Sequence, residues 1–117
     1  MANPVETAVA TYIEVFSERD PVKRVAMIDA CFAENGRFVT QSREMRGRAA
    51  IAAMATQLFA DPTVAGVRVL ALEARGTTFR FRSVVEKQDG TTHEFFDAGE
   101  IDADGRIALI LTFPGSF

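Results

Sequence analysis

The chain has 117 residues, 48% of them hydrophobic and 25% charged, which is the composition of a folded domain and suits one core over residues 1–117. Its formal net charge of −3 argues against nucleic acid and anionic membranes as partners, and no stretch approaches the 18 apolar residues that span a bilayer. One cysteine and one histidine allow no internal disulfide and supply few of the ligands that zinc prefers, so we expect a cytoplasmic protein without a metal or other cofactor.

The first half of the sequence predicts three helices. Asn3 and Asp20 each precede a proline, which is typical of a helix that begins with a side-chain cap and has proline at its first position. Apolar residues at helical spacing then predict helices over residues 4–16, 21–32 and 51–59. Each of these helices has one apolar face, which must pack against another layer.

The second half predicts an antiparallel sheet. From residue 64 onward, β-branched and aromatic residues dominate, interrupted by turn dipeptides at Arg75-Gly76, Asp89-Gly90 and Asp104-Gly105. The expected long strands are 64–74, 77–87, 92–102 and 106–113, and two short strands, 37–41 and 43–46, are expected before the third helix. The predicted fold class is therefore α+β, with three N-terminal helices packed on a curved antiparallel sheet.

The turns predict which residues face one another across the sheet. A two-residue turn at 89–90 places Arg82 opposite Asp97, and a three-residue loop at 103–105 places Asp97 opposite Leu111. The same register places Glu86 opposite His93 and Phe95 opposite Phe113. We expect the sheet face that carries Arg82 and Asp97 to line a pocket.

The opposite face of the predicted sheet has apolar residues of its own: Phe79, Phe81, Phe96 and Ile110. Three helices can cover only one face of the sheet, so these side chains would form an exposed apolar patch. We therefore expect a homodimer formed through this outer sheet face.

Several short segments, in this order of elements, resemble one known superfamily. They are Ala10-Thr11-Tyr12-Ile13, Asp20 at the start of the second helix, Phe32-Ala33 leading to Arg37-Phe38-Val39, Gly47-Arg48-Ala49-Ala50-Ile51, and Phe96-Asp97 ahead of Asp104-Gly105-Arg106-Ile107. The chain resembles the nuclear transport factor 2-like superfamily, in its SnoaL-like and ketosteroid isomerase-like branch. That resemblance implies a cone-shaped α+β barrel with a pocket for a small hydrophobic organic ligand. The superfamily contains enzymes, binding proteins and assembly domains, so the fold alone does not give the function.

The resemblance singles out Tyr12 and Asp97. Ketosteroid isomerases use a tyrosine on the first helix and a protonated aspartate on the third long strand to donate hydrogen bonds to a developing enolate oxygen. Tyr12 and Asp97 match those positions. The isomerase also needs a carboxylate base, and Thr40, which cannot take up a proton, stands where the resemblance would place it.

The same residues have a structural interpretation. Tyr12 can be a core aromatic residue, and Asp97 can form a cross-strand ion pair with Arg82. Beside Arg82 the carboxyl of Asp97 would be ionised and accept hydrogen bonds, whereas alone in an apolar pocket it would be neutral and donate one. An arginine–aspartate pair also resembles limonene epoxide hydrolase, but a second interior aspartate is not evident.

We interpret the chain as a SnoaL-like pocket protein of unassigned activity, with Tyr12, Asp97 and Arg82 as candidate catalytic residues. The expected ligand-binding residues are Phe16, Thr40, Met54, Phe95, Leu111 and Phe113. As an enzyme it would be a cofactor-independent isomerase, cyclase or hydratase of a hydrophobic carbonyl or hydroxyl compound. The alternative is a non-catalytic ligand-binding or dimerisation module, and the sequence leaves open whether any reaction is catalysed.

Overall fold

The structure, a computed structural model, describes residues 3–115; the side chain of Phe59, which the sequence assigns to the third helix, lies outside the described part. The elements follow the order α1 (Pro4–Val15), α2 (Pro21–Cys31), β1 (Phe32–Val39), β2 (Glu44–Arg46), α3 (Arg48–Phe59), β3 (Val64–Arg75), β4 (Thr78–Lys87), β5 (Thr92–Ile101) and β6 (Ile107–Pro114). The predicted α+β class and order of elements are confirmed. The largest difference in bounds is β1, which begins directly after α2 rather than at residue 37.

Side-chain caps begin the first two helices, as the sequence predicts. Asn3 Oδ1 accepts a hydrogen bond of 2.8 Å, and Asp20 Oδ1 one of 2.9 Å, each from the backbone N–H two residues later. A proline stands at the start of both helices. These caps fix where α1 and α2 begin, and therefore which of their residues face the core.

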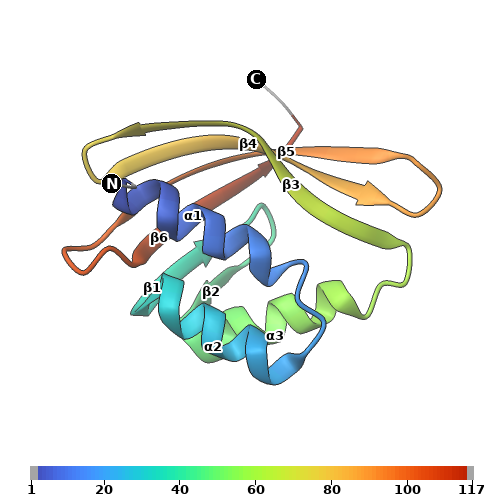
Figure 1. Cartoon of the computed structure of the whole chain (residues 1–117), viewed down its shortest axis with the longest axis horizontal. Helices are drawn as coiled ribbons and strands as arrows, with labels where there is room; N and C mark the ends of the chain where they lie inside the picture. Colours follow the sequence, from blue (N-terminus) through green and yellow to red (C-terminus); the bar gives the residue numbers. More distant parts are fainter. Residues whose placement is uncertain (1–2, 116–117) are drawn as a thin grey trace.

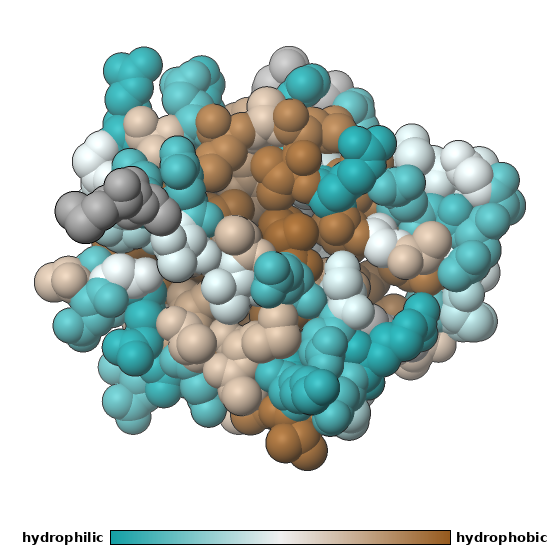
Figure 2. All heavy atoms as spheres, in the orientation of Figure 1, coloured by the Kyte–Doolittle hydropathy of each residue, from teal (hydrophilic) through white to brown (hydrophobic). Residues whose placement is uncertain are grey.

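The six strands form one sheet in the order β2-β1-β6-β5-β4-β3, with β1 parallel to β6 and every other pair antiparallel. The sheet curves over the helices without closing, and the three helices lie on one side of it (Figure 1). The core lies between these layers. Its most deeply buried side chains include Val5, Val9, Ile28, Phe32, Phe81, Ile107 and Ile110. In the same orientation, Figure 2 shows hydrophobic atoms gathered between α1 and the strands above it.

The hairpin between β4 and β5 has a three-residue loop, so the predicted two-residue turn is wrong. The Lys87 N–H donates to the Thr91 carbonyl at 2.9 Å, and the Gly90 N–H donates to the Lys87 carbonyl at 3.0 Å. Gly90 has a φ of +89°. A tight turn followed by a glycine in the left-handed region is a common three-residue hairpin loop. The additional loop residue shifts the pairing of β4 with β5 by one position.

The loop between β5 and β6 has the predicted three residues, since the Asp102 N–H donates to the Arg106 carbonyl at 2.8 Å. A bulge then changes the register. Ile101 pairs with Ile107, but the preceding residue of β5 pairs with Leu109, so Ala108 is an additional residue in β6. The rest of β6 is therefore shifted by one position from the prediction.

The two shifts exchange the inner and outer faces predicted for β4 and β6, whereas β5 keeps its predicted faces. Asp97 faces Phe81 on β4 and Thr112 on β6, not Arg82 and Leu111. The predicted pair of Glu86 with His93 is also wrong, because those residues pair with Thr92 and Val85. Three residues predicted for the outer face are buried in the core: Phe79, Phe81 and Ile110. Three residues predicted for the pocket lie on the outer face: Arg82, Leu111 and Phe113.

Candidate ligand pocket

The helices and the inner sheet face surround a pocket of about 180 Å³ that opens to solvent on one side. Its apolar walls come from the C-terminal end of α1, from α3 and from four of the strands: Phe16, Phe38, Met54, Leu58, Val67, Val85 and Phe95. Its polar side chains are Tyr12, Thr40, Ser83, Asp97 and Thr112. A mostly apolar wall with a few converging polar groups is the usual design of a small-molecule site.

Asp97 is the one buried carboxylate among residues 3–115, with 2% of its surface exposed. Its Oδ1 atom has no hydrogen-bond partner in the described part of the chain. Burial raises the pKa of this carboxyl to about 7, and the nearby Thr112 hydroxyl opposes the rise. Near neutral pH the protonated and ionised forms of Asp97 therefore coexist.

Tyr12 reaches the same end of the pocket from α1. It is 5% exposed, and its ring contacts four phenylalanine rings whose centroids lie 5.1 to 6.1 Å from its own. Burial, and then the negative charge of Asp97, hold the pKa of Tyr12 well above its usual value. Tyr12 is thus both a core aromatic residue and a pocket residue, and its hydroxyl stays protonated and able to donate.

Thr112 stands directly opposite Asp97 in the β5–β6 pairing. Its Oγ1 atom is buried and forms no hydrogen bond to any residue that the structure describes. The hydroxyl is nevertheless close enough to both Tyr12 and Asp97 to lower the pKa of each. The polar end of the pocket therefore consists of a phenol, a carboxyl and an aliphatic hydroxyl on three different elements.

Thr40 directly follows β1, which is the place predicted for it, but its hydroxyl belongs to a turn. It donates to the Arg43 carbonyl at 3.2 Å and accepts from the N–H groups of Ser42 and Arg43 at 3.4 and 3.3 Å. The nearby Glu44 is exposed and forms an ion pair with Arg37. Asp97 is accordingly the one carboxylate among the described lining residues.

A family model described as a SnoaL-like domain matches residues 9–110. The chain belongs to the SnoaL-like family. No curated protein sequence matches it.

Solved structures show the same fold. A SnoaL-like family protein from Agrobacterium tumefaciens, provisionally named an isomerase, is 24% identical, with a TM-score of 0.83 over 97% of this chain and 98% of its own. An epoxide hydrolase of Mycobacterium tuberculosis, described as similar to limonene epoxide hydrolase, is 15% identical, with a TM-score of 0.71 over 96% and 83%. A protein from Catenulispora acidiphila with a ketosteroid isomerase-like fold, in complex with trimethylamine, is 14% identical, with a TM-score of 0.74 over 90% and 82%. At these identities the likeness concerns the fold alone.

The pocket of this SnoaL-like domain brings together six of the nine residues singled out from the sequence: Tyr12, Phe16, Thr40, Met54, Phe95 and Asp97. The other three, Arg82, Leu111 and Phe113, lie across the sheet from it. Arg82 faces Phe96 on the outer side, so the predicted ion pair with Asp97 is wrong. Without that pair, Asp97 is in the situation in which burial favours its neutral form.

Ser83 and Thr112 are the polar pocket residues that sequence reasoning missed. A signal for Ser83 exists, because Phe79, Phe81, Ser83 and Val85 alternate along β4 and share one face. No comparable signal exists for Thr112. The sheet face on which Thr112 lies depends on the bulge at Ala108, and no residue pattern in the sequence predicts that bulge.

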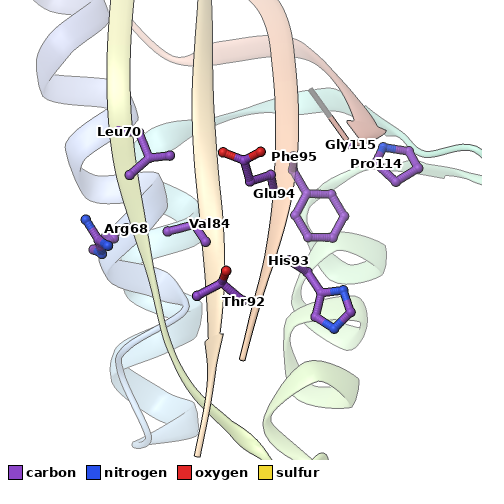
Figure 3. A pocket seen from close by; sticks show the side chains of 9 residues that line it. All are labelled: Arg68, Leu70, Val84, Thr92, His93, Glu94, Phe95, Pro114 and Gly115. Atoms are coloured by element: carbon purple, nitrogen blue, oxygen red, sulfur yellow. The ribbon is translucent and has the colours of Figure 1, made fainter. Parts of the chain in front are cut away.

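A larger hollow, about 580 Å³, lies on the outer face of the SnoaL-like domain. Figure 3 shows Leu70, Val84 and Glu94 on the side of the sheet away from the helices, with Phe95 beside Pro114 at its margin. The hollow is an open groove whose arginine, Arg68, is bound to Glu86 at 2.6 Å. It contains no buried ionisable side chain among the described residues, so the smaller inner pocket is the better candidate site.

Neither a metal centre nor a membrane span is present in the described residues. No three side chains of the kinds His, Cys, Asp or Glu within residues 3–115 are grouped to hold a metal ion. No helix in that range is both long enough and apolar enough to cross a membrane.

Proposed function

We propose that this SnoaL-like domain binds one small, largely apolar molecule, whose carbonyl or hydroxyl oxygen sits at the polar end of the inner pocket. The observation that carries the proposal is Asp97, a carboxyl that is 2% exposed and has an unpartnered Oδ1 atom. A buried polar atom without a hydrogen bond costs about 1–3 kcal/mol. A ligand oxygen that hydrogen-bonds to Asp97 would offset this cost.

The polar groups suit acid–base chemistry on such an oxygen. Tyr12 and protonated Asp97 can both donate to it, and two donors on one oxygen stabilise a developing enolate or alkoxide. With a pKa of about 7, Asp97 can also give up or accept a proton at neutral pH. These properties support an isomerase, cyclase or hydratase reaction with Asp97 as the catalytic acid or base and Tyr12 as the second donor. Arg82 has no part in the proposal, because it lies across the sheet.

The size of the pocket limits the ligand. An apolar cavity of about 150 Å³ holds one benzene ring. The volume of this open pocket, about 180 Å³, therefore suits a single ring with a few substituents and holds only part of the four fused rings of a steroid. A monocyclic ketone, enone or alcohol is the substrate class that fits.

Cyclohex-2-en-1-one is a suitable probe, since its ultraviolet absorption moves to longer wavelength when the carbonyl oxygen accepts hydrogen bonds. We expect saturable binding with such a shift, and about 3- to 10-fold weaker binding by Asp97→Leu, which removes one hydrogen-bonding group. Asp104→Leu, in the exposed β5–β6 loop, is the matched control and should bind like the native protein. No saturable shift with the native protein, or equal affinity in both variants, would contradict the proposal.

The outer sheet face supports a second function, self-association. Leu70 and Phe113 are 37% and 42% exposed there, next to the half-buried side chains of Phe96, Leu109 and Leu111. Since the helices lie on the other side of the sheet, a second copy of the chain that packs face to face would cover this apolar surface. The proposed homodimer thus keeps the predicted face but uses different residues, because Phe79, Phe81 and Ile110 are in the core.

A further inference from the structure

We propose that Thr112 is a positioning residue of the ligand site: its hydroxyl holds the Asp97 carboxyl by a hydrogen bond and presents it to the ligand oxygen. The inference rests on the proposed function and deepens it, because it assigns a role to a third polar group. Two independent features of the geometry support it, the cross-strand register and a pair of unpartnered atoms.

The register places Thr112 directly opposite Asp97 on the inner sheet face. Directly opposed residues of antiparallel strands have Cβ atoms about 4.5–5.5 Å apart, so rotation about the Cα–Cβ bond of threonine can bring its hydroxyl to the carboxyl. This proximity exists because of the bulge at Ala108. Without the bulge, Leu111 would stand opposite Asp97, and Thr112 would point to the outer face.

Asp97 Oδ1 and Thr112 Oγ1 are both buried, and both lack a hydrogen-bond partner among the described residues. Both atoms gain the hydrogen-bond partner that they lack if the Thr112 hydroxyl binds the Asp97 carboxyl, or if both groups bind one ligand oxygen. A hydroxyl serves either protonation state of the carboxyl, because it can donate to an oxygen of the ionised form or to the carbonyl oxygen of the neutral form, and the single proton of the neutral form is then left for the ligand. Thr112 can therefore hold Asp97 in one orientation while Tyr12 remains free to donate to the ligand.

Few other titratable groups within residues 3–115 face Asp97. Tyr12 approaches it from α1 and stays protonated, and Cys31 on α2 acts on Tyr12 but is neutral, since burial raises the pKa of its thiol to about 12. Arg82, from β4, projects to the opposite face of the sheet. The Thr112 hydroxyl is thus the polar group positioned to favour the ionised carboxyl.

Two variants separate a positioning role from a packing role. Thr112→Val keeps the branched shape and removes the hydroxyl, whereas Thr112→Ser keeps the hydroxyl. The first readout is the pKa of Asp97, followed by carbon-13 NMR of its carboxyl carbon. We expect Thr112→Val to raise this pKa by about 0.5–1 unit, the equivalent of one hydrogen bond, and Thr112→Ser to leave it near the native value.

The second readout is the affinity for cyclohex-2-en-1-one. We expect Thr112→Val to weaken binding by about 2- to 10-fold and Thr112→Ser to restore it. An unchanged pKa and unchanged affinity in Thr112→Val, or a serine variant that behaves like valine, would overturn the inference while Asp97→Leu could still support the proposed function. If the native protein does not bind the enone, the proposed function fails, and the pKa measurement alone decides the role of Thr112.

Discussion

Asp97 links the stability of the fold to pH, because its pKa is about 7 in the folded chain and about 3.9 in an unfolded one. The folded state holds the proton more tightly, so its stability relative to Asp97→Asn is greatest below pH 4. That advantage is lost as the pH rises to 7 and stays lost above it, a change of about 4 kcal/mol. Urea unfolding of both proteins between pH 4 and pH 8 measures the difference. Parallel stability profiles would show that the carboxyl titrates normally.

The location of a residue in the pocket could be predicted from the sequence where it depends on the residue spacing within a single helix. Tyr12 and Met54 lie on helix faces that the spacing of apolar residues defines, Phe16 directly follows α1 in the same pattern, and all three line the pocket. The protonation state of Asp97 was not predictable in this way, because it depends on whether Arg82 faces it from another strand. The sequence is consistent with an ionised and with a neutral Asp97, and the register decides between them.

At the scale of elements, the sequence predicts the helices and long strands well but not their pairing. Caps, prolines and glycine-containing turns mark the element ends, whereas the register depends on the number of residues in each loop. Asp89-Gly90 fits a two-residue turn and a three-residue loop equally well, and Ala108 carries no mark of a bulge. One residue of error in either place exchanges the inner and outer faces of a strand.

Gly90 tests the loop that sets this register. Its φ of +89° is unfavourable for a residue with a side chain, so Gly90→Ala should destabilise the fold by about 1–2 kcal/mol. Gly66 on β3 is the matched control, because its φ is not positive and an added Cβ would meet no atom within 4 Å. Urea unfolding at one pH compares the two alanine variants. Equal losses in both would indicate a general effect of replacing glycine and not strain in the loop.

At the scale of the whole molecule, the order of elements was sufficient to predict the SnoaL-like architecture. Each half of the chain has an apolar face that needs the other, and a curved sheet with helices on one side satisfies both. The two sides of the sheet then carry different proposed functions. The inner side holds the ligand pocket, and the outer side holds the proposed dimer interface.

Phe113 provides the test of that interface. It is 42% exposed on the outer face, and Phe113→Arg would place a charge within the apolar surface that a second copy covers. Val22 on α2 is 77% exposed on the helical side, so Val22→Arg is the matched control. By light scattering at tens of micromolar, we expect twice the chain mass of 12.8 kDa for the native protein and Val22→Arg, and the mass of one chain for Phe113→Arg.

The two sheet faces should respond independently to substitution. Because Phe113 lies across the sheet from the pocket, Phe113→Arg should keep the native affinity for cyclohex-2-en-1-one, and Asp97→Leu should keep the native mass. A native protein with the mass of one chain would remove the dimer proposal without affecting the pocket. If Phe113→Arg loses both the doubled mass and enone binding, pairing of two chains is needed to shape the pocket, and the two functions are one.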